Sequence, residues 1–373
     1  MIYLDNAATT KYKPEEVYEA YNYYVREIGV SPGRGSYQLG IQASRMLYKS
    51  RTTIGRFFGL IEPENVIFTK NSTEAINLFF RGFLQKCDHV IISCYEHNAV
   101  LRPIEKLKRE GIIEYSVISR NDLDLRPELL YLKYVKKNTR LIAMTLASNL
   151  TGRVVFNQDV LAYFKSNGIS TFVDASQGGG KIVIDMNKQN IDYLAFTGHK
   201  DLYAMPGVGG LCCVNKIQFN PLIQGGTGIY GEEYVNPLIF PEEYEAGTIN
   251  MPAIWSLQEG IKYINNNRHY ISKTENGLMT YLVKMLSELT NVVIYDYGKN
   301  RVSTCCFNIK NNKSSEVIEF LDKKDICCRG GIHCSILAHQ AIGTVDTGAV
   351  RISLDYNNTF EEINKLIEVL NEM

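Results

Sequence analysis

The sequence predicts an α/β protein with a mainly parallel central sheet, helices on both faces of that sheet, and a smaller α+β unit. Two observations support this fold class. From about residue 65, short apolar runs alternate with amphipathic stretches of helix length. Beyond Asn250 the pattern changes to long helical stretches followed by short strands. With 373 residues, of which 45% are hydrophobic, the chain is long enough to bury a sizeable core.

The predicted strands of the central sheet are short apolar runs separated by predicted helices. Such runs, buried on both sides, are typical of parallel sheets covered by helices. We expect strands at residues 66–69, 90–93, 141–144, 171–173 and 193–197.

Polar residues follow these runs directly, where ligands bind in open α/β sheets, outside the carboxyl ends of the strands. The groups that follow the first four runs are Asn71-Ser72-Thr73-Glu74, Glu96-His97-Asn98, Ser148-Asn149, and Asp174 with Gln177.

The last third of the chain predicts two helices, at about 252–265 and 269–289, and then strands at 292–295 and 304–307. Further helices are expected at 315–321 and 359–370. Thr359 or Asn358 would begin the last of these, because Glu362 follows Thr359 at the spacing of a capping box.

Composition excludes several classes of protein. Forty basic and forty acidic residues cancel, so no net field attracts nucleic acid. No apolar run approaches the roughly 20 residues that cross a bilayer, and the N-terminus lacks the pattern of a secretory leader, so we expect no membrane partner. Nine cysteines, six of them in adjacent pairs, indicate reduced thiols in the cytoplasm rather than a disulfide framework.

Asp174 and Lys200 together point to one cofactor. A lysine at a strand end can form an imine with pyridoxal 5′-phosphate, and an aspartate at the neighbouring strand end can keep the pyridine nitrogen protonated. Each residue alone is a weak signal. The pair is stronger, because only one short predicted strand, 193–197, lies in the interval between them.

Other residues at the strand ends suit the same cofactor. Ser72 and Thr73 begin a helix after a strand, where free N–H groups and hydroxyls bind a phosphate, although an ordinary helix cap has the same residues. His97 would lie over a pyridine ring or shuttle protons, or it would have a purely structural role. Asn149 and Gln177 would donate to the cofactor's phenolate oxygen, or would satisfy loop carbonyls.

The segment from Cys327 to His339 has two functional interpretations. A metal site would use Cys328, His333, Cys334 and His339, but the spacing lacks the C-x-x-C pairs of structural zinc sites, so we expect no metal. The alternative is a reactive Cys334 thiol in a mobile Gly-Gly loop, beside Arg329 and His333, which would stabilise a thiolate. A buried, inert cysteine in a turn remains the third option.

With these residues in view, the chain resembles the class V aminotransferase-like enzymes that use pyridoxal phosphate (PLP), and among them the cysteine desulfurase and selenocysteine lyase group. The resemblance runs nearly from end to end. Besides the motifs above, it rests on Tyr3-Leu4-Asp5-Asn6-Ala7-Ala8-Thr9-Thr10, Thr197-Gly198-His199-Lys200, Glu245-Ala246-Gly247-Thr248-Ile249-Asn250, Arg329-Gly330-Gly331-Ile332-His333-Cys334 and Arg351-Ile352-Ser353.

The resemblance implies a PLP fold-type I homodimer, with a large PLP-binding domain over residues 16–262 and a small domain from 1–15 and 263–373. It also implies a role for each matching residue. Lys200 would be the Schiff-base lysine, Asp174 the pyridinium partner, and His97 the stacking residue. Phosphate ligands would be Ser72, Thr73, Thr197 and His199, with Thr248 reaching the phosphate in the neighbouring subunit. Arg351 would clamp the substrate carboxylate, Arg34 and Asn149 would also contact substrate, and Cys334 would carry the persulfide.

The activity implied is cleavage of the C–S or C–Se bond of L-cysteine or L-selenocysteine to give L-alanine, with the sulfur on Cys334 or released. The short cysteine loop resembles the group that hands sulfur to an acceptor protein. The chain departs from the usual pattern of this group at Gly33, Tyr37, Ala204, Met205 and Ser335, and these positions bear on the substrate and the acceptor rather than on the cofactor. The alternatives are a PLP-dependent aminotransferase or β-eliminating lyase of the same fold, or a protein without turnover.

Overall fold

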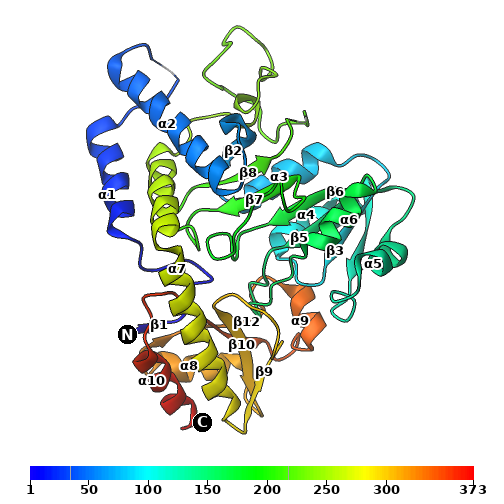
Figure 1. The fold of residues 1–373 in the computed structure, drawn as a ribbon, viewed down its shortest axis with the longest axis vertical. Helices are drawn as coiled ribbons and strands as arrows, with labels where there is room; N and C mark the ends of the chain where they lie inside the picture. The colour runs from blue at the N-terminus through cyan, green and yellow to red at the C-terminus, as the bar shows by residue number, and fades with distance from the viewer. Residues whose placement is uncertain (34, 217) are drawn as a thin grey trace.

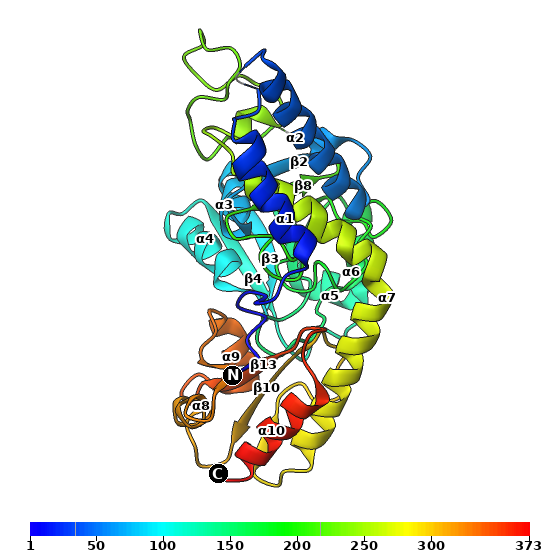
Figure 2. The same ribbon diagram turned by 90° about the vertical axis from the view of Figure 1, so that its left-hand side faces the viewer.

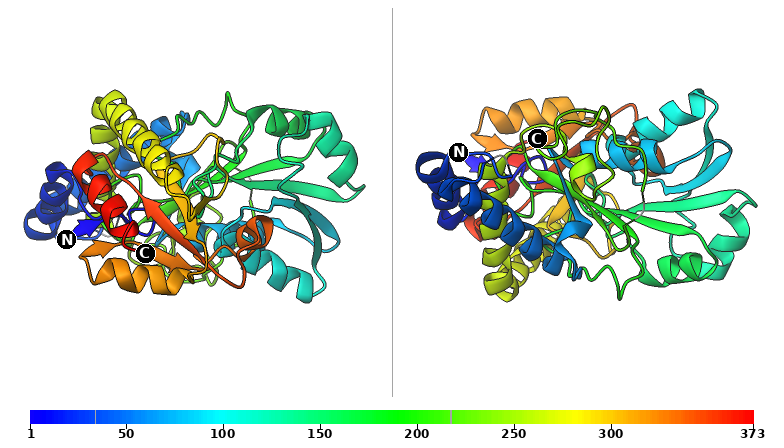
Figure 3. Two further views of the ribbon diagram at one scale, coloured as in Figure 1. Left: turned by 90° about the horizontal axis from the view of Figure 1, so that it is seen from below. Right: turned by 90° about the horizontal axis from the view of Figure 1, so that it is seen from above.

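The computed structural model describes residues 1–33, 35–216 and 218–373. Arg34, a predicted substrate contact, lies outside the described residues. The molecule is elongated, with a large unit around the main sheet and a smaller unit beside the chain termini (Figure 1). The long helix α7, Met251–Ser287, runs along both units (Figure 2). Both chain ends lie at the small unit, as the view from below also shows (Figure 3).

The large unit is built on a seven-stranded sheet in the order β2-β8-β7-β6-β5-β3-β4. Its strands are β2 (Val66–Thr69), β3 (Asp88–Ser93), β4 (Ile113–Ile118), β5 (Thr139–Thr145), β6 (Ser170–Asp174), β7 (Tyr193–Thr197) and β8 (Gly209–Cys213). All neighbours from β7 to β4 pair in parallel, while β8 is antiparallel to both β7 and β2. The link from β7 to β8 contains no helix, and parallel strands need a longer crossover, so β8 turns back.

Helices cover both faces of this sheet because alternate strand residues point to opposite sides. Val90 and Ile92 of β3 pack into the core under helices α3 and α4, whereas Ile91 packs into the core on the other face. The helices of the large unit are α1 (Glu15–Tyr23), which continues as a π-helical turn (Tyr24–Ile28), α2 (Gln38–Phe57), α3 (Ser72–Phe83), α4 (Asn98–Arg109), α5 (Pro127–Tyr134) and α6 (Gln158–Ser166). The predicted mainly parallel, helix-covered sheet is confirmed.

The small unit is an α+β structure with its own core. Its main sheet has the order β12-β13-β10-β9 and is antiparallel throughout, and β1 pairs in parallel with β11. Its elements are β1 (Ile2–Tyr3), β9 (Val292–Ile294), β10 (Thr304–Ile309), α8 (Ser314–Asp322), β11 (Ile326–Cys327), β12 (Arg329–Gly331), α9 (Ile336–Ile342), β13 (Ala349–Ser353) and α10 (Phe360–Leu370). The pairing of β1 brings the N-terminus here, while the domain boundary after residue 262 stays a prediction.

Helix α7 differs from the expectation of two helices. It continues through the polar stretch Asn265–Asn267 without a break, although asparagine has a low helix propensity. The helix packs against α1 and α2 in its first part and against α10 later, and this tertiary packing outweighs the local preference. No helix in residues 1–33, 35–216 and 218–373 has the length and hydropathy needed to span a membrane.

Candidate functional site

A cavity of about 210 Å³ lies at the carboxyl ends of β5, β6 and β7. It brings together nine of the ten predicted cofactor residues, from loops that are far apart in the sequence. The nine are Ser72, Thr73, His97, Asn149, Asp174, Gln177, Thr197, His199 and Lys200; Asn71, Thr145, Ala147 and Ser176 complete the lining. The site thus forms where the polar residues follow the strands.

One wall of the cavity is the N-terminus of α3. The side chain of Asn71 caps the helix by accepting a hydrogen bond from the N–H of Glu74 at 3.0 Å, so Ser72 and Thr73 occupy its first turn. Their position gives an anion both hydroxyls and free backbone donors. Gly209 permits this arrangement, because a Cβ there would lie 2.7 Å from the Cα atom of Asn71.

Asp174 ends β6 and is 2% exposed. Its Oδ1 oxygen accepts hydrogen bonds from the N–H and the hydroxyl of Ser176, at 3.0 and 2.5 Å. Burial raises the pKa of this carboxyl, and the two bonds from Ser176 and the nearby Lys200 oppose that shift. Within the described part of the chain both of its hydrogen bonds fall on Oδ1, which leaves Oδ2 for a cationic N–H in the cavity.

Lys200 follows β7 by three positions and lines the cavity with its side chain half-buried. Burial lowers the pKa of its amine, and the cations Arg351 and Arg329 act in the same direction, while Asp174 opposes them. The amine is therefore more readily neutral, as a nucleophile or base requires.

His97 is the N-cap residue of α4, and its Nδ1 atom accepts a hydrogen bond from the N–H of Ala99 at 3.0 Å. Burial, followed by the nearby Lys200, lowers the pKa of the imidazole to about 4. The ring is consequently neutral at pH 7, and since Nδ1 is an acceptor, the single proton lies on Nε2.

The N-terminal segment supports the loop that carries Lys200, a role that the sequence pattern did not assign. Thr10 donates its hydroxyl to the carbonyl of Lys200 at 2.9 Å, and its N–H to that of His199 at 3.2 Å. The Nδ1 atom of His199 lies 3.0 Å from Oγ1 of Thr9, and burial lowers the pKa of this imidazole to about 4. The paired threonines at the end of the N-terminal motif, Thr9 and Thr10, were the available signal.

Two buried polar atoms in the cavity wall have no hydrogen-bond partner among the residues that the structure describes. They are Oγ1 of Thr197 and Oδ1 of Asn149. A buried polar atom without a partner is costly, so both atoms suit a polar ligand. By contrast, the amide of Gln177 donates to the carbonyl of Ala7 at 2.7 Å, which is the loop-satisfying alternative considered for it.

Cys334 lies on the short segment between β12 and α9, and its side chain is exposed. The backbone holds this segment against the cavity wall: the Cys334 carbonyl accepts from the N–H of Asn98 at 2.8 Å, and Asn149 donates its amide to the His333 carbonyl at 2.8 Å. A guanidinium nitrogen of Arg329 lies 4.0 Å from Sγ. Instead of a Gly-Gly loop, Gly330 and Gly331 lie in β12.

Arg351 is buried in β13 beside the cavity, with 1% of its side chain exposed. Its guanidinium donates to the Asn149 carbonyl at 2.9 Å and pairs with Asp5 at 2.5 Å. Its Nε atom lacks a partner within residues 1–33, 35–216 and 218–373. A substrate carboxylate would therefore have to use Nε or displace Asp5.

One predicted cofactor residue lies outside this cavity, and the metal set that the spacing of its residues disfavours does not form among the described residues. Thr248 is exposed and lines a different pocket, with Lys70 and Ile223, rather than the cavity that contains Lys200. The alternative metal set of Cys328, His333, Cys334 and His339 does not come together, because no group of three or more potential ligands suited to a metal occurs in the described ranges.

Comparisons with known proteins match nearly the whole chain. The model of the aminotransferase class-V family matches residues 2–366. A probable cysteine desulfurase of Methanothermobacter thermautotrophicus is 31% identical, over 100% of this chain and 94% of that protein. A probable cysteine desulfurase of Borreliella burgdorferi is 30% identical, over 98% and 90%. The apo structure of a cysteine desulfurase from Thermococcus onnurineus has a TM-score of 0.90 at 28% identity, over 100% and 94%.

The chain belongs to the aminotransferase class-V family, whose enzymes depend on PLP. The resemblance expected from the motifs is confirmed, and so is fold-type I. Two of these three relatives are named probable cysteine desulfurases and the third a cysteine desulfurase.

Proposed function

We propose that this protein is a PLP-dependent cysteine desulfurase that converts L-cysteine, or L-selenocysteine, into L-alanine and passes the sulfur or selenium to Cys334 or releases it. One observation carries the proposal. Lys200 and Asp174 line one cavity, and the backbone of Cys334 is hydrogen-bonded to Asn98, the residue after His97 in the same wall. An exposed thiol at that place distinguishes a desulfurase from other enzymes of the family.

The cavity residues fit PLP in charge and in hydrogen bonding. The phosphate would lie at the N-terminus of α3, with the unpartnered hydroxyl of Thr197 and the ring of His199 beside it. Asp174 would pair with the pyridinium N–H through Oδ2, and the neutral ring of His97 would lie against the pyridine. When bound, PLP supplies an electron sink for negative charge at the substrate α-carbon.

Lys200 has two tasks in the proposed reaction. It would hold the cofactor before substrate arrives, and its freed amine would then remove the α-proton of the substrate as a general base. Burial prepares the amine for both tasks, because it lowers the pKa and so increases the neutral fraction near pH 7.

Cys334 would take the sulfur as a thiolate. Its sulfur forms a bond to the substrate sulfur while the C–S bond breaks, the bonding electron pair stays with carbon, and a proton then completes alanine. The guanidinium of Arg329 lies 4.0 Å from Sγ, beside the sulfur that would attack. Arg351 would orient the substrate carboxylate, which requires the ion pair with Asp5 to open or Nε to bind.

A homodimer is part of the proposal. Large apolar side chains are exposed on the loop after β8, among them Tyr234 at 105%, Leu238 at 73% and Val235 at 67%. Exposed apolar patches of this kind mark interaction sites, and Thr248 follows on the same loop. A second copy of the chain would cover this surface and receive Thr248 at its phosphate. The proposal also includes a cytoplasmic location and an acceptor protein that takes the sulfur from the persulfide.

The decisive experiment supplies PLP and L-cysteine to the purified protein and measures alanine and sulfide, with and without a reductant. A desulfurase forms one alanine for each sulfur, at first on the protein and then as sulfide once a reductant is present. L-Selenocysteine in a parallel series establishes the preference between sulfur and selenium. Pyruvate with sulfide would identify a β-eliminating lyase, amino transfer to a keto acid would identify an aminotransferase, and a protein that takes up no PLP would contradict the proposal.

A further inference from the structure

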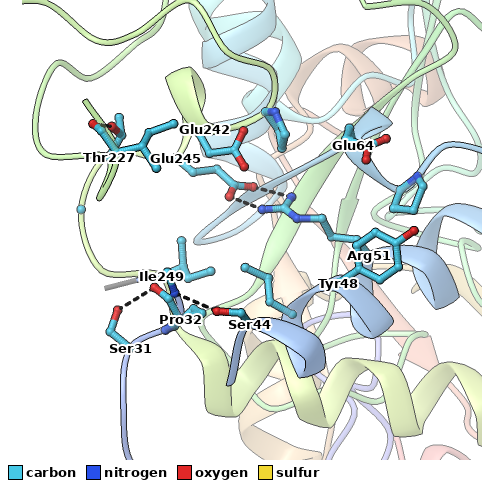
Figure 4. A pocket seen from close by; sticks show the side chains of 16 residues that line it. Ser31, Pro32, Ser44, Tyr48, Arg51, Glu64, Thr227, Glu242, Glu245 and Ile249 are labelled. Atoms are coloured by element: carbon cyan, nitrogen blue, oxygen red, sulfur yellow. Dashed lines mark hydrogen bonds and ion pairs between the residues drawn. The ribbon is translucent and has the colours of Figure 1, made fainter. Parts of the chain in front are cut away.

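Arg51 and Glu245 form a buried ion pair outside the cavity that contains Lys200. Their side chains are 7% and 6% exposed, and the guanidinium of Arg51 meets the carboxylate with both terminal nitrogens, one of them 2.8 Å from Oε1 (Figure 4). The pair is also bonded to the backbone of β2. Glu245 accepts from the N–H of Phe68 at 2.6 Å, and Arg51 donates to the Val66 carbonyl at 2.5 Å.

This pair fixes the beginning of the segment that bears Thr248. Residues 245–250 contain no helix or strand before α7 begins. Asn250 fixes the other end, because its amide donates to the Gly207 carbonyl at 3.3 Å. Gly247 between them has φ +104°, a conformation that other residues rarely adopt. Between the two ends, the N–H of Gly247 donates to the Gly226 carbonyl at 2.8 Å. The position of Thr248 therefore depends on the two anchored ends together with this contact.

One face of α2 holds two loops at once. Ser44, Leu47, Tyr48 and Arg51 follow at helical spacing and line a cavity of about 290 Å³ (Figure 4). Ser44 accepts from the N–H of Gly33 at 3.0 Å, which holds the loop 31–33, and Arg51 holds the loop 242–249 on the other side. Helix α2 is thus the common support of both loops.

We propose that Arg51 is a positioning residue: through Glu245 it sets Thr248 at the dimer interface, and so controls how tightly the partner subunit retains its cofactor. This inference rests on the proposed function, in which Thr248 reaches the phosphate in the neighbouring subunit. A lysine at position 51 would keep the charge but lose the bidentate contact. The Glu245 carboxylate would then be buried with an incomplete set of partners, and the loop would shift to satisfy it.

A double-mutant cycle tests the inference with PLP as the probe. The PLP dissociation constant is measured by absorbance titration for the wild-type protein, Arg51→Lys, Thr248→Ala and the double variant. Loss of a charged hydrogen bond predicts about tenfold weaker binding in Arg51→Lys. In the Thr248→Ala background the same substitution is expected to have no further effect, because Arg51 acts through Thr248. Additive losses, or unchanged affinity in Arg51→Lys, would overturn the inference.

Arg120→Lys is the matched control. Arg120 also bonds a buried carboxylate, that of Asp296 at 2.8 Å, so its loss should lower thermal stability without coupling to Thr248. If Arg51→Lys fails to fold, Glu245→Gln replaces it, since the amide retains an acceptor for the N–H of Phe68. A wild-type protein that binds no PLP overturns the proposed function and this inference together, whereas PLP binding with additive losses overturns the inference alone.

Discussion

Ser176 gives both its backbone N–H and its hydroxyl to a single carboxylate oxygen of Asp174. The two bonds stabilise the ionised carboxylate against the cost of burial, and they hold the carboxyl plane in one orientation. A carboxylate prepared in this way on the wall of a small cavity is suited to bind a cationic N–H group of a ligand.

Asp174→Ala is expected to keep part of the PLP affinity, through the phosphate contacts, and to lose catalysis. Without the carboxylate the pyridine nitrogen loses its proton and becomes a poor electron sink. We expect kcat/KM to fall more than tenfold, a loss of more than about 1.4 kcal/mol in transition-state stabilisation. Steady-state kinetics with L-cysteine measure this, and the exposed Asp159→Ala serves as the control. Activity above a tenth of wild type contradicts the role of Asp174.

Lys200→Ala is expected to remove the visible absorption band of lysine-bound PLP and all detectable turnover. No other lysine lines the cavity in the described part of the chain, so no second amine is placed to replace it. A spectrophotometric titration with PLP and an alanine assay measure both effects. Lys108→Ala, at an exposed position of α4, should retain both, and a Lys200→Ala protein that kept the band would remove Lys200 from its role.

Cys334→Ser is expected to bind PLP and cysteine normally and to form no persulfide. Lys200, Asp174 and Arg351 are unchanged in this variant, but a hydroxyl does not replace a thiolate as sulfur acceptor. Mass spectrometry after stoichiometric cysteine should find one extra sulfur on the peptide that contains Cys334 in the wild type and none in the variant. Cys87→Ser, at another exposed cysteine, is the control.

The substrate must be cysteine in this test, since the weaker C–Se bond of selenocysteine can break without a thiol. Full alanine production from cysteine by Cys334→Ser would show that the thiol is dispensable. The lyase alternative would then take precedence over the desulfurase.

PLP-saturated protein is expected to be a dimer, because Thr248 is exposed in one chain and is proposed to complete the site of the other. Analytical ultracentrifugation over a range of protein concentrations, with activity measured in parallel, tests this. Thr248→Ala should weaken PLP binding about tenfold while leaving the sedimentation coefficient unchanged, as expected for the loss of one hydrogen bond to a charged group. An active, PLP-saturated monomer is the contrary result.

The buried histidines are expected to lower the free energy of unfolding as the pH falls from about 6.5 to about 4, whereas Glu96 and Glu275, whose pKa values burial raises to about 8 and about 7, act in the opposite direction between those values and about 4.5. Burial lowers the pKa of His89, His97 and His199 to about 4, so between about pH 6.5 and 4 these histidines bind more protons in the unfolded chain than in the folded one. Their stabilising contribution is complete above the unfolded value and is lost as the pH passes through the folded one. Each contributes up to about 1.4 kcal/mol per pH unit to the slope.

Urea unfolding at several pH values measures this slope. His89 is remote from the cavity, and its ring nitrogens are hydrogen-bonded to Thr139 and Ser116 at 2.8 and 2.9 Å. His89→Gln should therefore remove the contribution of one histidine from the slope. His269→Gln, at an exposed position of α7, is the matched control. An unchanged slope in His89→Gln would contradict the lowered pKa of His89.

The strand ends and their polar residues were predictable because the signal is local. An apolar run followed by Asp174 or by the loop to Lys200 identifies both the strand and the edge of the sheet where ligands bind. The strands β4 and β8 of this sheet were not predicted. The antiparallel direction of β8 was also missed, since the direction of a strand depends on the length of its connection and not on its own residues.

Long-range contacts were not predictable in the same way. Arg51 and Glu245 are 194 positions apart, and no residue next to either of them in the sequence indicates that they pair. The same holds for the hydrogen bond from Thr10 to the carbonyl of Lys200 and for the ion pair of Asp5 with Arg351. Both join the first residues to later parts of the chain. The continuous helix α7 was missed because asparagines 265–267 disfavour a helix locally, whereas packing decides the outcome.

Helix α7 has a mechanical consequence. At 37 residues it is about 55 Å long, and it forms one of the two chain crossings between the units, the other being the segment that Thr9 and Thr10 anchor. A protease finds no loop to cut in the helix, and a gene divided at residue 262 would leave each fragment with only part of the helix and an uncovered apolar stripe. Helix α7 thus joins the unit that contains Lys200 to the unit that contains Cys334 without a flexible connection.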